Sequence, residues 1–311
     1  MFLLTATPGM HAARTLFAAN STNEHEFLKT SSRKFEYFAA EFLSLDIAAL
    51  VDNHRFDKYF AMLESLPQPV IFAHRGASAY APENTLAAFE LALAQNADGI
   101  ELDVKLTADG RVVVIHDATV DRTTGVRGRV KDLPLADLRA LGAGSFFSEN
   151  FQSEKIPTLE EVFETVGRRT FINIELTNYN SPRDQLVENV CTLVKKFELE
   201  KRVMFSSFFA LNLSKARGHL PDVPRGLLAF NGVLGAWARS FGFAFGKYQA
   251  LHPHLNNATP QQIQRVHRLN RRVHVWTVNA AQDMRQLFNW GVDAIFTDDP
   301  QLAVQVREES R

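Results

Sequence analysis

From Val70 onward, short apolar runs typical of strands alternate with stretches typical of helices as far as the end of the chain. The strand-like runs are VIFA, DGIELDV, RVVVIH, FINIEL, RVMFSS, GLLAF, ALHP, VHVWTV and DAIFTD. Most are separated by helix-like stretches, of which TLEEVFETVG and TPQQIQRVHRLN are examples. This alternation predicts an α/β fold of the (β/α)8 barrel type, in which a ring of parallel strands is covered by helices.

One joint in this pattern predicts an irregular barrel, because the runs number nine and a closed (β/α)8 barrel holds eight strands. DGIELDVKLTADGRVVVIHD connects two runs through a short turn at Asp109 and Gly110, whereas a parallel crossover needs about a dozen residues. Either these two strands pair antiparallel, or one of them lies outside the regular repeat. The segment 117–156 is too long for an ordinary loop, so we expect a small insertion there, beside the candidate site that is described below.

The chain divides by composition into an arm, residues 1–66, and the barrel, residues 67–311. Residues 33–65 carry aromatic residues and leucines at helical spacing, which predicts a partly helical arm. No function follows from the arm's sequence. Pro67 and Pro69 mark the boundary, because proline disfavours helix at the preceding residue.

Charge, cysteine content and the length of apolar runs limit the partners and the location that we expect for this protein. Thirty-four basic residues almost balance 35 acidic ones, so the formal net charge of -1 gives no reason to expect nucleic acid as a partner. A single cysteine, Cys191, excludes an intrachain disulfide and favours a cytoplasmic location. No apolar run approaches the length of an integral membrane segment. Self-association cannot be predicted from these features.

Two strand-like runs carry acidic residues. Glu101 and Asp103 stand two apart, so both side chains leave one face of a strand. Glu175, near the end of FINIEL, would lie at the carboxyl-end mouth of a barrel, where such folds place their chemistry. Side-by-side carboxylates repel each other unless a cation lies between them, and oxygen ligands favour Mg²⁺ or Ca²⁺. The competing interpretation is that Glu101 and Asp103 face solvent from an edge strand.

Two histidines end apolar runs. His74 follows VIFA and His116 follows RVVVI, so each emerges from the core at a strand end. One such histidine is often structural, but two beside three acids suit a general acid and base. Arg75 can grip an anionic oxygen with two hydrogen bonds, and Gly76 permits a sharp turn next to it. The combination indicates phosphodiester chemistry.

These motifs resemble the glycerophosphodiester phosphodiesterase family. The resemblance rests on HRGASAYAPENT, then GIELDVKL, VVVIHDATVDRTT, INIEL, VHVWTVN and IFTDDP, in that order from about residue 70 to 300. It implies a barrel that hydrolyses small-molecule glycerophosphodiesters to glycerol 3-phosphate and an alcohol with a divalent cation. It does not cover the arm.

Carried over by position, the resemblance implies roles for individual residues. Glu101, Asp103 and Glu175 are implied as metal ligands, His74 and His116 as the acid/base pair, and Arg75, Asn84 and Trp276 as substrate-binding residues. Asn84 has an alternative role as the N-cap of the following helix, and Trp276 as plain barrel packing.

At one position the chain departs from the family pattern. Thr177 stands where the family often has lysine, two residues after the third acid. Lys105 lies on the same strand face as Glu101 and Asp103, so we expect it to bind substrate and to replace part of the missing charge.

Two other functions remain open. One is a phospholipase-type phosphodiesterase acting on lysophospholipids or inositol lipids, because FNGVLGAWARSFGFAFGKY is rich in aromatic residues that an acyl chain could contact. We favour a crossover helix packed on the barrel for this stretch. The other is a non-catalytic phosphodiester-binding barrel, against which the complete set of two histidines and three acids argues.

Overall fold

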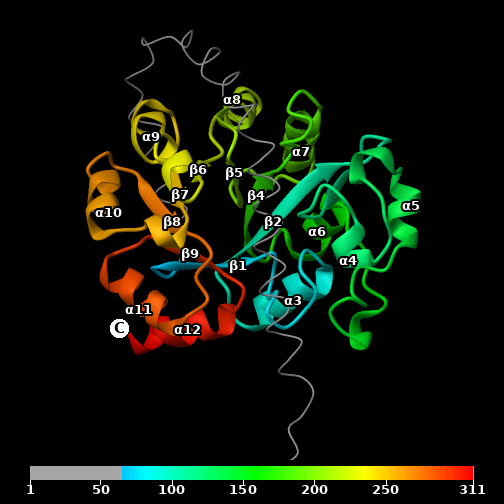
Figure 1. The fold of residues 1–311 in the computed structure, drawn as a ribbon, viewed down its shortest axis with the longest axis horizontal. Coiled ribbons are helices and arrows are strands. Elements are labelled where there is room, and N and C mark those ends of the chain that lie inside the picture. Colours follow the sequence, from blue (N-terminus) through cyan, green and yellow to red (C-terminus); the bar gives the residue numbers. More distant parts are fainter. Residues whose placement is uncertain (1–64, 311) are drawn as a thin grey trace, which may run out of the picture. The chain divides into compact units, whose positions relative to one another are not determined.

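The computed structural model describes residues 65–310, and the predicted arm lies outside them apart from its last two residues. Within them the strands form one sheet in which β1 pairs in parallel with both β2 and β9, so eight parallel strands close into a barrel. Figure 1 shows the strands at the centre and the helices around them. The (β/α)8 prediction is confirmed.

The strands are β1 (Val70–His74), β2 (Gly99–Leu106), β3 (Val112–Val114), β4 (Phe171–Leu176), β5 (Val203–Ser207), β6 (Arg225–Ala229), β7 (Ala250–Pro253), β8 (Arg272–Val275) and β9 (Ala294–Thr297). The α-helices are α3 (Leu86–Ala94), α4 (Asp121–Thr124), α5 (Leu135–Ala140), α6 (Leu159–Val166), α7 (Leu186–Lys196), α8 (Ala210–His219), α9 (Phe243–Phe245), α10 (Pro260–His267), α11 (Ala281–Asn289) and α12 (Pro300–Glu309). All nine strand-like runs form strands.

The irregular joint has a simple explanation. Strand β3 pairs antiparallel with β2, with Val104 opposite Val114, and it lies outside the ring of eight parallel strands. Both interpretations of the ninth run are therefore correct. After β3, the chain forms α4, two 3₁₀ turns (η2, Val130–Asp132; η3, Glu149–Phe151) and α5 before α6 leads into β4. Apolar side chains hold this region together: Val113, Ile115, Val120, Val130, Leu138, Ala143 and Ile156.

Local sequence explains where several helices begin. Thr158 and Glu161 form a reciprocal capping box at α6, so both satisfy backbone N–H groups that the first turn leaves open. Thr259 and Asp299 cap α10 and α12, each followed by proline at the first helical position. The apolar stripe of α7 is buried against the barrel.

The last helix is tied to the first strand by an ion pair. Arg307 of α12 contacts the carboxylate of Asp98, with its second nitrogen 3.2 Å from Oδ1, and both side chains are less than 8% exposed. Asp98 Oδ2 also accepts the backbone N–H of Ile71, at 2.7 Å, and Arg307 donates to the Pro69 carbonyl at 3.0 Å. This buried pair fixes the end of the chain to the beginning of the barrel.

The interior of the barrel has an apolar floor and a polar mouth. The floor consists of Val70, Phe72, Phe171, Met204, Ala250, Ala294 and Phe296. His252 and His274 lie fully buried on β7 and β8 with ring centroids 4.8 Å apart, and His274 packs near Phe72. Gly226 makes room for His252, because a Cβ there would lie 2.1 Å from Nε2.

The connection between β6 and β7 differs from the expected crossover helix. It forms a 3₁₀ turn (η4, Val233–Gly235), a π turn (η5, Ala238–Gly242) and the short α9. Val233, Phe241 and Phe245 are 90%, 68% and 72% exposed instead of packing on the barrel. The expectation of a packed crossover helix is therefore wrong for these side chains. Among residues 65–310, no helix has the length and apolar character that crossing a bilayer requires.

Candidate active site

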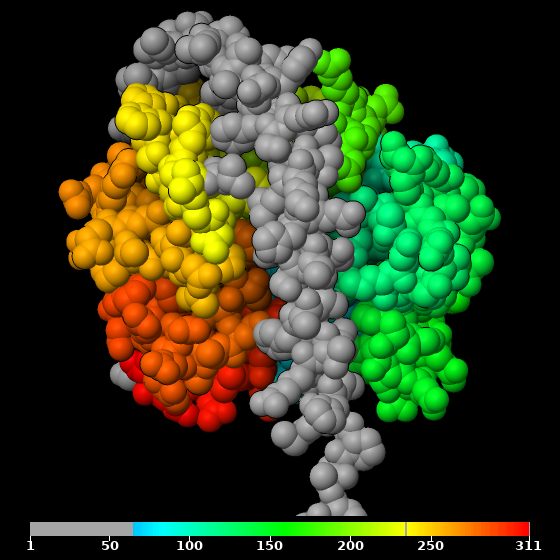
Figure 2. Space-filling view, in the orientation of Figure 1, coloured from blue at the N-terminus to red at the C-terminus, as the bar shows by residue number. Residues whose placement is uncertain are grey.

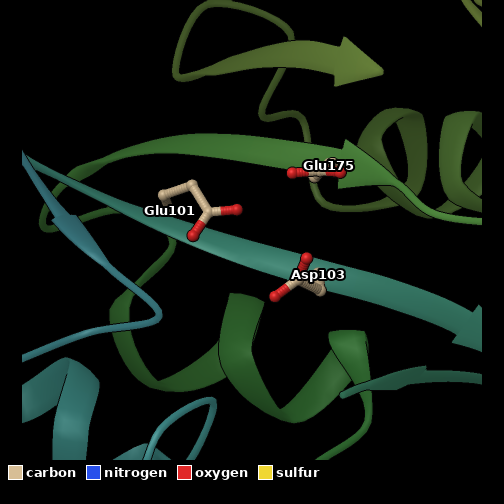
Figure 3. A group of neighbouring side chains, drawn as sticks. All are labelled: Glu101, Asp103 and Glu175. Atoms are coloured by element: carbon tan, nitrogen blue, oxygen red, sulfur yellow. The ribbon is translucent and has the colours of Figure 1, made fainter. Parts of the chain in front are cut away.

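Three carboxylates meet on one face of two neighbouring strands, β2 and β4. Asp103 of β2 lies opposite Glu175 of β4, and Glu101 is on the same face of β2 one pleat earlier. One oxygen from each of the three lies within 4.8 Å of the others (Figure 3). Glu101 and Asp103 are 3% and 1% exposed, so the interpretation as a solvent-facing edge pair is wrong.

Burial and mutual repulsion oppose ionisation of this cluster. Burial, Asp103 and Glu175 raise the pKa of Glu101 well above its usual range. Burial and Asp103 raise the pKa of Glu175 to about 8. Burial also acts on Asp103, but the charges of His116 and Arg75 outweigh it and hold the pKa of Asp103 below its usual value. An oxygen-only donor set that repels itself fits a hard divalent cation.

Asn84 supports the central carboxylate. Its side-chain amide donates to Asp103 Oδ2 at 3.0 Å, and its Oδ1 accepts from the Asp103 backbone N–H at 3.4 Å. The N-cap of α3 is Thr85, whose hydroxyl accepts from the Ala88 N–H, so the N-cap interpretation of Asn84 is wrong. Asn84 is buried, and its hydrogen bonds orient Asp103.

Arg75 lies among acidic groups at the turn after β1. Its backbone N–H donates to Glu101 Oε2 at 3.0 Å, and its guanidinium lies 3.0 Å from Glu83 and 3.4 Å from Asp103. These carboxylates raise the pKa of Arg75 despite its burial. Gly76, at φ +84°, completes the turn, because a Cβ there would lie 2.6 Å from the Ala88 backbone.

His74 is oriented by a carboxylate 224 residues further along the chain. Its Nδ1 lies 2.7 Å from Asp298 Oδ1, and Ser78 donates to the same oxygen at 3.1 Å. Asn279 donates to Asp298 Oδ2 at 2.6 Å. Burial alone would raise the pKa of Asp298, but the hydrogen bonds from His74 and Asn279 hold it below its usual value. An ionised Asp298 accepts a hydrogen bond from a protonated Nδ1 of His74, so Nε2 of the same ring is the atom that can face a substrate.

His116 has a matching partner. Its Nδ1 lies 2.7 Å from Asp117, whose other oxygen accepts from Arg122 Nε at 2.7 Å. Arg122 also binds Glu83 with two hydrogen bonds of 2.7 Å. Because Glu83 contacts Arg75 as well, a continuous chain of charges links the two sides of the mouth. Burial opposes the charge on Asp117, but His116 and Arg122 hold its pKa well below the usual range.

Lys105 and Thr177 lie side by side. The ammonium donates to the Thr177 hydroxyl at 2.8 Å and to its carbonyl at 3.1 Å. Burial lowers the pKa of Lys105, although Asp103 and Glu175 act in the opposite direction. The positively charged ammonium group of Lys105 therefore lies next to Thr177, on the strand face that the spacing on β2 predicts.

Aromatic side chains form one wall of the mouth. Trp276 donates its indole N–H to the His252 carbonyl at 2.8 Å, and its ring lies 5.6 Å from that of Phe208. Phe208 stacks on Phe230 at 4.1 Å and lies 5.9 Å from Tyr179. Tyr179 in turn donates its hydroxyl to Glu175 at 2.7 Å, so the wall continues to the carboxylate cluster.

Sequence reasoning missed the partners of the site residues. Glu83, Asp117, Arg122 and Asp298 all belong to quoted motifs, namely PENT, HD, DRTT and FTDDP, and these motifs were the signal that could have identified them. Tyr179 follows Glu175 by four residues and carries no comparable signal. Its contact depends on how the chain turns after β4.

Comparison with known proteins decides the family. The glycerophosphoryl diester phosphodiesterase family matches residues 74–302. The chain belongs to this family. It is an enzyme, a glycerophosphodiester phosphodiesterase, and the site described above lies inside the matched region.

Relatives and solved structures agree. A glycerophosphodiester phosphodiesterase of Caldanaerobacter subterraneus subsp. tengcongensis is 40% identical over 238 residues, which cover 76% of this chain and 97% of that protein. One from Bacillus altitudinis is 37% identical over 245 residues, covering 78% and 99%. The structure of an Oleispira antarctica phosphodiesterase in complex with the product sn-glycerol-3-phosphate has a TM-score of 0.72 at 31% identity, covering 79% and 99%.

Proposed function

We propose that this phosphodiesterase hydrolyses glycerophosphodiesters to glycerol 3-phosphate and an alcohol, using a divalent cation and two histidines as general acid and base. The observation that carries the proposal is the group of three carboxylates, whose oxygens lie within 4.8 Å of one another, next to two histidines that aspartates orient. The product complex of the Oleispira antarctica relative supports glycerol 3-phosphate as a product.

Glu101, Asp103 and Glu175 would hold the cation. The raised pKa values of Glu101 and Glu175 reflect burial and repulsion, which a positive charge among the three would relieve. When bound, Mg²⁺ or Ca²⁺ supplies electrostatic stabilisation of the charge that develops on the phosphate. Asn84 keeps Asp103 in position for this role.

His74 and His116 transfer the protons. One imidazole accepts a proton from the attacking hydroxyl, and the other donates a proton to the departing alkoxide. Attack by water gives glycerol 3-phosphate directly, whereas attack by the substrate's own glycerol hydroxyl gives a cyclic phosphate that water then opens. Asp298 and Asp117 accept hydrogen bonds from Nδ1, which leaves Nε2 of each ring for the reaction. Each histidine has an aspartate 2.7 Å from its Nδ1, and this similar arrangement suits two residues of which one acts as the general acid and the other as the general base.

The remaining site residues bind the substrate. Arg75 faces Asp103 and Glu83 and places a guanidinium where it can pair with a phosphate oxygen. Lys105 adds a second positive charge on the other side of the carboxylates. Trp276 offers an apolar surface to the glycerol carbons, in keeping with its position in the aromatic wall.

The test has two arms. Chelation by EDTA should abolish hydrolysis of glycerophosphocholine, and added Mg²⁺ or Ca²⁺ should restore it. Calorimetry should show that Glu175→Gln binds the cation more weakly than the unchanged protein, which is a readout independent of turnover. Full activity after thorough chelation would contradict the proposed role of the metal.

The second arm concerns the histidines. His74→Ala and His116→Ala should each lower kcat by about 10²-fold or more, the usual share of general acid–base catalysis. His219→Ala, at an exposed position of α8, is the matched control and should retain full activity. Near-normal turnover in both variants would contradict the acid/base assignment. Substrate binding without turnover under any metal would instead support the non-catalytic barrel.

The aromatic wall favours a second substrate class. Phe208, Phe230 and Trp276 present ring surfaces close to the carboxylate cluster, and an acyl or alkyl chain on the leaving alcohol could pack against them. A comparison of glycerophosphocholine with lysophosphatidylcholine distinguishes the two. A higher kcat/KM for the lysophospholipid, lost in Phe230→Ser, would establish the second class.

A further inference from the structure

One long section of the barrel contains no acidic residue. The chain has 35 acidic residues, yet residues 223–282 contain none and carry seven lysines and arginines. We call residues 223–282 the acid-free sector. It includes the β6–β7 connection, α10 and β8, which appear in yellow and orange in Figures 1 and 2. Its charge is therefore positive within a chain whose total charge is close to zero.

Backbone carbonyls hold two of these charges without neutralising them. Arg239 donates to the carbonyls of Phe230 and Gly232, and Arg271 donates to the carbonyl of Phe243. The pKa of each is lowered by burial, and in neither case does a carboxylate oppose the shift. Arg265 and Arg268, on and just after α10, are exposed. The sector thus presents positive charge that an anionic surface would complement.

The same sector carries most of the large apolar side chains that the described residues expose. Of nine such side chains, five belong to it: Val233, Trp237, Phe241, Phe245 and Leu269. Phe241 and Phe245 stack in parallel with ring centroids 6.2 Å apart, one helical turn from each other. Apolar side chains grouped in this way usually mark an interaction surface, because exposing them to water is unfavourable.

The β6–β7 connection also begins at the mouth of the barrel. Phe230, its first residue, stacks on Phe208 in the aromatic wall, and the Gly232 N–H donates to Asn257, just after β7, at 3.1 Å. Arg271 lies over the Phe243 ring at 4.9 Å, which joins the connection to the segment after α10. A partner bound here would therefore lie near the entrance to the site.

We propose that the acid-free sector docks on the surface of an anionic lipid bilayer. Aromatic and aliphatic side chains would enter the interface while the arginines contact lipid phosphates, the usual arrangement of proteins that lie on a membrane without spanning it. Bases could stack on the exposed rings, but a bilayer also accounts for the exposed aliphatic side chains of Val233 and Leu269, which offer no ring to a base. This docking is independent of the proposed catalytic roles.

Vesicle co-sedimentation of the full chain tests the proposal. Vesicles of phosphatidylcholine and phosphatidylglycerol in roughly equal parts should pellet the protein at low salt, and vesicles of phosphatidylcholine alone should pellet much less. The double substitution Phe241→Ser/Phe245→Ser should lower the apparent partition coefficient by about tenfold or more. It removes two phenyl groups that the bilayer would partly bury in the bound state. Arg265→Gln/Arg268→Gln should weaken binding and flatten its dependence on salt.

Controls separate docking from folding and from activity. Phe147→Ser removes an exposed phenylalanine outside the sector and should leave sedimentation unchanged. All variants should keep their thermal midpoint and their turnover of soluble glycerophosphocholine, because none of the changed residues belongs to the site. Equal sedimentation of the Phe241/Phe245 variant and the unchanged protein would overturn the proposal.

Two further outcomes would also overturn it. Hydroxyl-radical footprinting of the free full chain should label Phe241 and Phe245, and vesicles should protect them. Protection without vesicles would mean that a second copy or another part of the chain already covers the surface. Tighter binding to a single-stranded RNA than to anionic vesicles, lost in the same variant, would assign the sector to nucleic acid.

Discussion

The Nδ1 atom of His74 lies 2.7 Å from Oδ1 of Asp298, although 224 residues separate them along the chain. Asp298 also accepts from Asn279 and Ser78, so its carboxylate is fixed from three directions. In the proposed mechanism it acts only through the imidazole and is therefore a positioning residue. The histidine is the last residue of the first strand, β1, and its orienting carboxylate directly follows the last strand, β9.

Asp298→Asn should lower kcat by about 10²-fold and change KM little, because the amide no longer fixes the proton on Nδ1 of His74. Steady-state kinetics on glycerophosphocholine would measure both constants. Asp137→Asn, on the exposed face of α5, is the control and should behave as the unchanged enzyme. A raised KM with normal kcat would show that Asp298 acts in substrate binding instead.

Lys105→Met should raise KM about tenfold for a phosphodiester substrate, since it removes a positive charge beside the carboxylate cluster and keeps the aliphatic volume. The matched control is Lys196→Met, which removes an exposed lysine of α7 paired with Glu160. If KM stays constant while the free energy of unfolding falls, Lys105 serves only to hold Thr177.

Asp98→Asn should lower the free energy of unfolding by about 3–5 kcal/mol, because it leaves the buried Arg307 guanidinium without its partner. Urea unfolding monitored by circular dichroism would measure the change. Arg285→Gln breaks the exposed pair between Arg285 of α11 and Glu309 of α12 and should have no measurable effect. If both substitutions lowered the free energy of unfolding equally, burial would not explain the larger effect expected for the Asp98–Arg307 pair.

Stability should fall in mild acid because of the two histidines inside the barrel. Burial lowers the pKa of His274 to about 4 and that of His252 well below its usual value. Between about pH 6.5 and pH 4 the unfolded chain binds protons that the folded chain excludes, so the free energy of unfolding decreases as pH falls. Each histidine contributes roughly 1.4 kcal/mol per pH unit in this range.

His274→Phe tests this dependence, since a phenyl ring of similar size can pack near Phe72 and Phe296 and does not titrate. Urea unfolding of both proteins at about pH 7.5 and about pH 5.5 should show a smaller loss of stability for the variant. Identical losses would mean that the folded barrel binds the proton as readily as the unfolded chain.

Much of the fold could be predicted from sequence because its signals are local. The nine apolar runs and the helix-like stretches between them reflect periodicity over a few residues. The carboxylate cluster follows from strand alternation plus parallel pairing. Glu101, Asp103 and Glu175 could thus be placed together before any coordinates. Their roles in metal binding, like those of the two histidines in catalysis, stay predictions.

Other features depend on contacts that no local pattern encodes. The partners of His74 and Arg75 come from segments far away in the chain or from turns, so periodicity does not reveal them. The β6–β7 connection has aromatic residues at helical spacing, but four glycines between residues 232 and 246 disfavour a regular helix. Asn84 and Thr85 are both good N-caps, and only the backbone geometry selects Thr85.

The pairing of β1 with β9 has a consequence for synthesis of the enzyme. A nascent chain exposes His74 early, but the carboxylate that orients this imidazole, just after the strand that closes the ring, follows 224 residues later. Incomplete chains, and chains that have lost their final segment by proteolysis, therefore lack an oriented His74 however well their earlier parts have folded. The order of the strands along the chain therefore delays the orientation of His74 until β9 and Asp298 have been synthesised.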